Sequence, residues 1–227
     1  MTRQLAFDLP VRAAMGRENF FVSPVNALAV AALDGWRDWA ENRMLLLGPP
    51  GAGKTHLAHV WAAGTQATIS SATDLPGRDL PRLVESGRLV VEDAERVAGD
   101  PVAETALFHL YNLAAAQGAA LLVTTAAPPR HWQLRLADLE SRMQAMAVTR
   151  LDPPDDALLS AVLVKLFADR QITVAPSLIP FLAQRMDRSI AAARDLVARL
   201  DAQALAERRP ITRQLASALL DSPDPPR

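Results

Sequence analysis

The sequence predicts an α/β fold with a parallel sheet flanked by helices, followed by a small all-α domain. Short apolar runs alternate with helical patterns through residues 43–151, which is typical of a parallel sheet covered on both faces. A glycine-rich segment, GPPGAGKT, joins one of these runs to a helix. After Pro153-Pro154 the pattern is helical throughout, and we therefore expect a second domain there.

The order of elements follows from caps and periodicity. The first helix is expected to begin with Ser23 as its cap and Pro24 in the first helical position. Its apolar side, at helical spacing, consists of Leu28, Ala31, Ala32 and Trp36. Apolar runs predict strands at residues 43–48, 67–69, 89–91, 120–123 and 145–151. Later helices are expected at residues 155–170, 177–186, 188–207 and 212–220, with caps at Ser177 and Thr212.

The composition narrows the class of protein. The 227-residue chain is 50% hydrophobic and 22% charged, with a formal net charge of −1, which fits a globular protein without strong direct DNA contact. The absence of cysteine excludes disulfides and thiolate metal sites. No signal-peptide core is present, and no apolar run reaches the roughly 20 residues of a membrane span, so we expect a cytoplasmic protein without membrane contact.

The segment GPPGAGKT fits the phosphate-loop pattern G-x-x-x-x-G-K-[ST] and lies between a strand and a helix, the context that the pattern requires. Its backbone N–H groups and the helix N-terminus would cradle phosphate oxygens. Lys54 would bridge the β- and γ-phosphates, and the Thr55 hydroxyl would help to hold Mg²⁺. The predicted nucleotide-binding residues are Gly48, Pro49, Pro50, Gly51, Ala52, Gly53, Lys54, Thr55 and the following His56.

Two further strand ends carry polar residues. Glu92 and Asp93 end the run LVVED, where one acid would hold Mg²⁺, assigned here to Glu92, and the other would polarise the attacking water. Which acid takes which role is left open. Thr125 ends the next run, and its hydroxyl would orient water against the γ-phosphate. The histidines show no spacing for a metal site, so we expect no metal other than Mg²⁺.

These elements, in this order, resemble AAA+ ATPases of the DnaA/Hda family, and within it the shorter Hda branch. The stretches GPPGAGKTHLAHVWAA, LVVEDAERVAGD, LLVTTAAPPR and LADLESRM carry the resemblance. It implies a clamp-binding segment and linker at 1–18, an AAA+ nucleotide-binding domain at 19–152, a helical lid at 153–220 and a disordered tail at 221–227. It also implies ATP or ADP with Mg²⁺ as ligands.

The resemblance gives Arg142 a specific role. Read alone, Arg142 is a surface arginine in an ion pair, worth less than about 1 kcal/mol. In the family this position is an arginine finger that reaches a nucleotide held by a neighbouring subunit and contributes about 10³–10⁵ in rate.

Two positions depart from the family pattern. The lid arginine of the family falls at Ala191, and either Arg188 or Arg194, three positions away on the same helix face, could replace it. Glu92 stands at the usual Asp position. Both departures imply slow intrinsic ATP hydrolysis.

The N-terminal segment QLAFDLP resembles clamp-binding peptides through Gln4, Leu5, Phe7 and Leu9. The alternative is an edge strand or a frayed terminus. The expected function is thus regulation of DNA replication initiation. The chain would dock on the DNA polymerase sliding clamp and stimulate hydrolysis of ATP bound to the initiator DnaA, with self-association left open. The alternatives are a self-contained ATPase that loads or remodels a replication protein, and a non-catalytic nucleotide-gated binding module.

Overall fold

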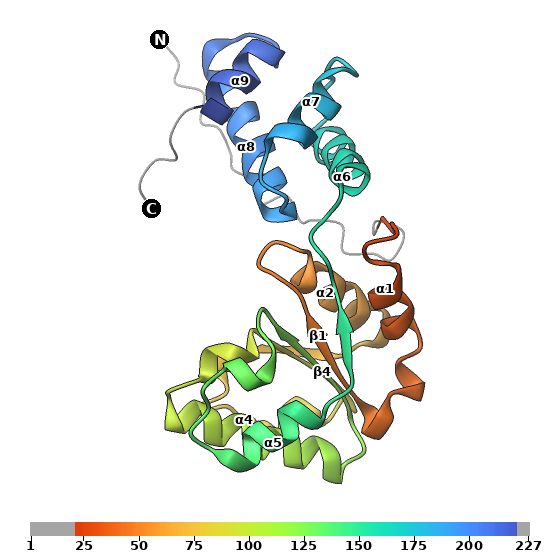
Figure 1. The fold of residues 1–227 in the computed structure, drawn as a ribbon, viewed down its shortest axis with the longest axis vertical. Helices are drawn as coiled ribbons and strands as arrows, with labels where there is room; N and C mark the ends of the chain where they lie inside the picture. The colour runs from red at the N-terminus through yellow and green to blue at the C-terminus, as the bar shows by residue number, and fades with distance from the viewer. Residues whose placement is uncertain (1–20, 222–227) are drawn as a thin grey trace.

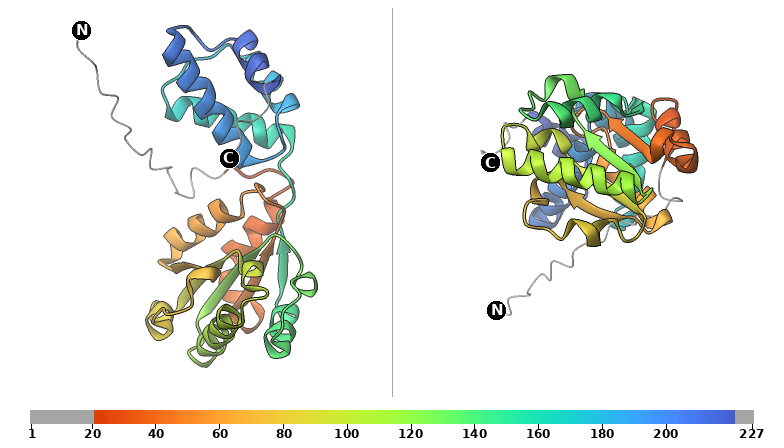
Figure 2. Two further views of the ribbon diagram at one scale, coloured as in Figure 1. Left: turned by 90° about the vertical axis from the view of Figure 1, so that its left-hand side faces the viewer. Right: turned by 90° about the horizontal axis from the view of Figure 1, so that it is seen from below.

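The computed structural model of the protein describes residues 21–221, which form two lobes joined by one strand-to-helix connection (Figures 1 and 2). The sheet domain runs to Leu151, and the lid begins at the helix that follows Asp155. The predictions for Gln4, Leu5, Phe7 and Leu9 and for residues 222–227 lie outside the described residues.

The sheet has the strand order β2-β3-β4-β1-β5, and every neighbouring pair is parallel. Its strands are β1 (Arg43–Leu47), β2 (Thr68–Ser71), β3 (Arg88–Glu92), β4 (Ala120–Thr125) and β5 (Val148–Arg150). Because all strands run the same way, the phosphate loop after β1, the two acids at the end of β3 and Thr125 at the end of β4 meet at one edge. The predicted fold class is confirmed.

Helices cover both faces of the sheet (Figure 1). Leu46 of β1 packs with α1 (Ala27–Asp34) and α2 (Lys54–Thr65) on one face. Leu45, the neighbouring residue, packs on the other face with α3 (Leu80–Val84), α4 (Pro101–Ala116) and α5 (Ala137–Ala145). Short 3₁₀ segments complete the domain at η2 (Trp36–Asp38), η3 (Ala40–Asn42), η4 (Ala72–Asp74), η5 (Ala94–Val97) and η6 (Pro129–His131).

The first helix differs from the sequence-based expectation. It begins at Ala27, because the Asn26 side chain accepts from Ser23 N and donates to the Phe21 carbonyl, both at 2.9 Å, and so holds a turn before the helix. Leu28 is 82% exposed, and the buried side consists of Ala29, Val30 and Leu33. A helix made almost wholly of Ala, Val and Leu offers several apolar faces, so periodicity alone chose the wrong one.

The lid packs α6 (Asp156–Asp169), α7 (Leu178–Arg185), α8 (Ile190–Glu207) and α9 (Arg213–Asp221) around Leu163, Phe167, Leu182 and Leu200. Side-chain oxygens of Asp155, Ser189 and Thr212 accept hydrogen bonds from first-turn N–H groups of α6, α8 and α9. Ser177 precedes α7 as predicted but makes no capping hydrogen bond. Within residues 21–221, no helix has the length and apolar character needed to cross a membrane.

Candidate nucleotide site

The phosphate loop leaves β1 at Gly48 and enters α2 at Lys54. Gly51 and Gly53 have φ values of 76° and 103°, a region that favours glycine because side chains clash there. The loop therefore turns tightly, and the first N–H groups of α2 lie at its end. Such unpaired N–H groups at a helix N-terminus attract phosphate oxygens.

Lys54 is buried and lies against its own loop. Its Nζ donates to the Gly48 carbonyl at 2.7 Å and to the Pro49 carbonyl at 3.1 Å. Burial lowers the pKa of the Lys54 ammonium, and the nearby carboxylates of Glu95 and Asp93 oppose that shift. The amine is therefore held inside the loop, between the main chain and an acidic strand end.

The two predicted acids occupy different environments. The Oε2 atom of Glu92 lies 3.2 Å from Nε2 of His59 on α2, and its Oε1 atom is buried without a hydrogen-bond partner. Asp93 has a positive φ of 53°, and its N–H donates to the Thr124 hydroxyl at 3.1 Å. The Asp93 carboxylate is 44% exposed and lies 3.9 Å from Arg96. Glu92 is thus held inside the site, whereas Asp93 reaches toward solvent.

Glu95 is a site residue that the sequence analysis missed. Its Oε1 accepts from Ala126 N at 2.9 Å, and its Oε2 is buried without a hydrogen-bond partner. It is also the carboxylate that raises the pKa of Lys54 most. In the sequence, Glu95 is recognisable only as a third acid, three residues after Glu92. The short 3₁₀ segment η5 brings its side chain close to Lys54.

Thr125 fastens the end of β4 to the phosphate loop. Its carbonyl accepts from Gly48 N at 3.1 Å. Its hydroxyl donates to the Ala127 carbonyl at 2.8 Å and accepts from Ala127 N at 3.2 Å. The side chain is fully buried, so in this conformation the hydroxyl shapes the following turn.

The lid contacts the phosphate loop through main chain. Ile190 N, at the start of α8, donates to the Gly51 carbonyl at 2.8 Å. A Cβ placed on Gly51 would lie 1.9 Å from Ser189 Oγ, and one on Gly53 would lie 3.0 Å from the Ile190 side chain. The glycines therefore allow both the loop turn and the close approach of the lid.

The two candidate lid arginines differ in position. Arg188 forms an ion pair with Asp156 at 2.8 Å and donates to the Pro154 carbonyl at 3.4 Å. Both contacts lie at the connection between the two domains. Arg194, three residues after Ala191 on α8, lies close enough to His56 to affect its charge. The pKa of His56 falls to about 4, because burial disfavours its charged form and Arg194 adds a nearby positive charge. His56 is therefore neutral at pH 7, with Arg194 close to it.

The residues present fit a magnesium ion. The Thr55 hydroxyl is exposed at the start of α2, and Glu92 offers a buried carboxylate oxygen that lacks a partner. Among residues 21–221, His, Asp and Glu side chains form no group of three or more suited to a metal ion. Mg²⁺ needs no such cage, because it is commonly bound by one or two protein oxygens together with phosphates and water.

Arg142 lies on α5, which covers the face of the sheet opposite to α2. Its Nε donates to Asn112 Oδ1 at 2.9 Å, and its guanidinium lies 4.8 Å from the centre of the Phe108 ring. Within residues 21–221, no hydrogen bond or ion pair engages its two terminal nitrogens. The start of α5 is fixed by buried Glu104, whose Oε2 accepts from the N–H groups of Arg135 and Leu136, both at 2.9 Å.

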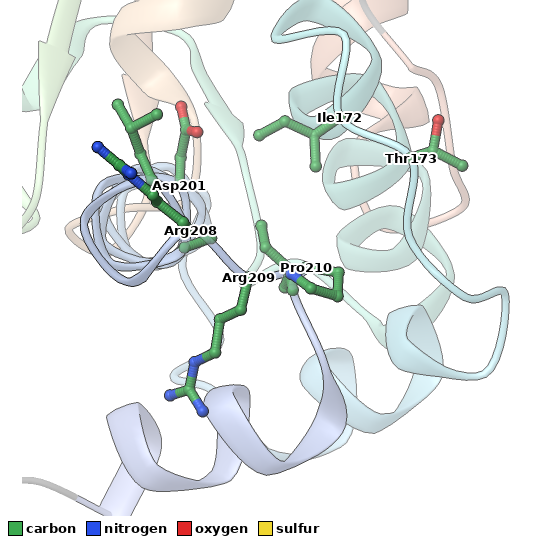
Figure 3. Close-up of a pocket in the computed structure, with 9 residues that line it drawn as sticks. Ile172, Thr173, Asp201, Arg208, Arg209 and Pro210 are labelled. Atoms are coloured by element: carbon green, nitrogen blue, oxygen red, sulfur yellow. The ribbon is translucent and has the colours of Figure 1, made fainter.

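A pocket of about 320 Å³ lies in the lid, at the opposite end of α8 from Ile190. Figure 3 shows Ile172 and Thr173 across from Asp201 and Arg208. Its lining residues are Ile172, Thr173, Asp201, Ala204, Leu205, Arg208, Arg209, Pro210 and Ile211. It does not belong to the phosphate site.

Sequence comparison finds relatives among replication initiator proteins. No protein-family model matches the chain. The chromosomal replication initiator protein DnaA of Thermomicrobium roseum is 25% identical over 231 residues, which cover 91% of this chain and 49% of that protein. DnaA of Herpetosiphon aurantiacus is 27% identical over 226 residues, covering 89% and 48%. The chain thus spans about half the length of the curated relatives it matches.

Solved structures show the same fold. Domain III of the Thermotoga maritima replication initiation protein DnaA superposes with a TM-score of 0.76 at 20% identity, covering 94% of this chain and 98% of that chain. The chain is therefore similar in sequence to DnaA proteins and has the fold of DnaA domain III. A replication initiator DnaA bound to AMPPCP and single-stranded DNA superposes with a TM-score of 0.67 at 17% identity, covering 84% and 67%. A RuvB variant from Thermotoga maritima gives 0.68 at 20% identity, covering 91% and 71%.

The structure brings most of the predicted site residues together at one edge of the sheet. The phosphate loop, Glu92, Asp93 and Thr125 come together there, with His56 and Arg194 beside them. Arg142 lies apart, on α5. Its separation from the phosphate loop agrees with a role toward another molecule, and that role remains a proposal, as does the likeness to the Hda branch.

Proposed function

We propose that the protein binds ATP or ADP with Mg²⁺ and supplies Arg142 to a nucleotide held by the initiator DnaA, whose ATP hydrolysis it stimulates. The observation that carries this proposal is the state of the Arg142 side chain. Asn112 and Phe108 hold it by Nε and by one ring face, and its terminal nitrogens have no partner among residues 21–221. A guanidinium held in this way is prepared to donate to phosphate oxygens.

The nucleotide would be held by the phosphate loop. Lys54 and the N–H groups at the start of α2 would bind phosphate oxygens, while Thr55 and Glu92 would hold Mg²⁺, which neutralises developing charge on the phosphates. The match of the chain to DnaA proteins, and the AMPPCP in one structural neighbour, support this assignment. We expect slow intrinsic hydrolysis, because Glu92 replaces a shorter acid and Ala191 provides no arginine.

The central experiment measures ATP hydrolysis by purified DnaA in the presence of clamp-loaded DNA. Wild-type protein should stimulate turnover, and Arg142→Ala should reduce the stimulation about 10³-fold, in the range reported for arginine fingers. Arg82→Ala, which removes an exposed arginine from α3, is the matched control and should stimulate like wild type. Equal stimulation by wild type and Arg142→Ala would contradict the proposal.

Docking on the sliding clamp would be the task of Gln4, Leu5, Phe7 and Leu9. A short peptide of this kind should bind in the micromolar range, equivalent to about −8 kcal/mol. Deletion of residues 1–10 should abolish retention of the clamp and leave nucleotide affinity unchanged. Retention of the clamp by the shortened chain would remove this part of the proposal.

A second candidate function is a nucleotide-gated binding module without a catalytic role. The hydrogen bond from Ile190 N to the Gly51 carbonyl favours it, because a nucleotide that reshapes the loop would alter the lid contact. Under this alternative, Arg142→Ala would leave the function in cells intact. The two proposals are therefore separated by the same variant.

A further inference from the structure

The carboxylate of Glu92 is held from α2 by a histidine that has no assigned role. Nε2 of His59 and Oε2 of Glu92 lie 3.2 Å apart, with the two side chains 29% and 18% exposed. An ionised carboxylate can only accept hydrogen bonds, so His59 must carry its proton on Nε2. The bond joins the middle of α2 to the end of β3, across the edge where the phosphate loop lies.

The other oxygen of this carboxylate is left without a partner. Oε1 of Glu92 is buried, and no hydrogen bond reaches it within residues 21–221. A buried carboxylate oxygen without a partner costs considerable free energy. Its position at the phosphate site indicates that a cation, or water bound to a cation, completes it when a nucleotide is present.

The third observation is the spacing on α2. His59 follows Thr55 by four residues, so the two side chains share one side of the helix. The proposed magnesium ligand Thr55 and the histidine that holds Glu92 are therefore presented together. A longer acid such as Glu92 has one more rotatable bond than Asp, and a hydrogen bond to one oxygen removes that freedom.

We propose that His59 is a positioning residue for the Mg²⁺ site: by binding Oε2 of Glu92 it aims Oε1 at the ion that accompanies the nucleotide. The inference rests on the proposed nucleotide-binding function. Outer partners of metal-binding carboxylates affect metal affinity about 10- to 100-fold. His59 would thus compensate for the longer acid at this position.

The test measures nucleotide affinity over a Mg²⁺ titration and again in EDTA. His59→Ala should raise the Mg²⁺ concentration at the midpoint about 10-fold while leaving affinity in EDTA unchanged. His59→Gln, whose amide can still donate to Glu92, should restore most of the midpoint. His109→Ala, an exposed histidine on α4, is the matched control and should behave like wild type.

A double-mutant comparison separates positioning from a general effect on stability. In a Glu92→Asp background the shorter acid should not reach His59, so His59→Ala should shift the Mg²⁺ midpoint less than about 2-fold, the usual error of additivity. An unchanged midpoint in His59→Ala, or an equal loss of affinity in EDTA, would overturn the proposal. So would failure of His59→Gln to restore the midpoint.

The same measurements distinguish failure of the proposed nucleotide binding from failure of the role of His59. If wild-type protein binds no nucleotide, both the nucleotide site and the role of His59 are refuted in the first measurement. If it binds nucleotide without any dependence on Mg²⁺, the nucleotide site stands and only the Mg²⁺ site, with the role of His59, is refuted. If Arg142→Ala stimulates DnaA normally, only the action toward DnaA falls, because the Mg²⁺ titration does not involve Arg142.

Discussion

The phosphate loop and the surface formed by Arg142, Asn112 and Phe108 belong to one domain, but they differ in how their polar groups are bound. At the loop, Lys54 bonds to main-chain carbonyls and Gly51 accepts a bond from the lid, so the site closes on groups of its own chain. At Arg142, one nitrogen is fixed by Asn112 while the terminal nitrogens stay without a partner within residues 21–221. The first arrangement suits a ligand taken from solution, and the second suits a contact that another molecule completes.

The largest effect is expected at Lys54, in the phosphate loop. Lys54→Ala should weaken nucleotide binding about 100-fold, equivalent to about 3 kcal/mol, because it removes a charged donor from a buried site. If the protein must hold a nucleotide in order to contact DnaA, Lys54→Ala should also lose the stimulation of DnaA. If it need not, the stimulation should stay at the wild-type level. Fluorescent-nucleotide titration measures the affinity. The control is Arg82→Ala, which removes one exposed positive charge from α3 on the other face of the sheet, and a comparable loss there would mean that net charge, not the loop, governs binding.

A smaller effect is expected at Asn112. Asn112→Ala removes the acceptor for Arg142 Nε, and the freed side chain should stimulate DnaA about 10-fold less, as for loss of one hydrogen bond to a charged group. Asn112→Asp retains an acceptor and should stimulate like wild type. Intrinsic nucleotide affinity should be the same in all three proteins. Full stimulation by Asn112→Ala would show that Arg142 needs no support from α4.

The smallest effects distinguish the two lid arginines. Arg194→Ala should weaken ATP binding several-fold relative to ADP binding, because Arg194 contributes positive charge at the phosphate side of α8. Arg188→Ala should instead lower the free energy of unfolding by less than about 1 kcal/mol, since it removes an exposed ion pair with Asp156. Isothermal titration and chemical denaturation measure the two quantities. The reversed result would reassign the phosphate contact to Arg188.

The fold and the loop were predictable because their signals are local. Gly51 and Gly53 are required by backbone conformation, and the strand before them is a continuous apolar run, so both can be read without knowing the rest of the structure. The lid helices were predictable for a similar reason, since Pro153-Pro154 and the cap at Thr212 mark limits, whereas the capping bond of Ser189 and the lack of one at Ser177 were not foreseen.

The rest depends on contacts between distant segments. Glu95 enters the site because η5 turns it toward Lys54 and Ala126 N binds it, and neither partner is its neighbour in the sequence. The exposure of Leu28 follows from which side of α1 meets the sheet, which periodicity in an evenly apolar helix does not reveal. The bond between His59 and Glu92 likewise joins residues 33 positions apart.

The hydrogen bond from Ile190 N to the Gly51 carbonyl holds the N-terminal end of α8 against the phosphate loop. The helix has 18 residues and is therefore about 27 Å long. A rotation of about ten degrees at the N-terminal end, over that helix length, would move the Arg208 end by roughly 5 Å. The pocket lined by Ile172, Asp201 and Arg208 lies at that end (Figure 3), so a rotation of this size would displace the surface on the distant side of the lid.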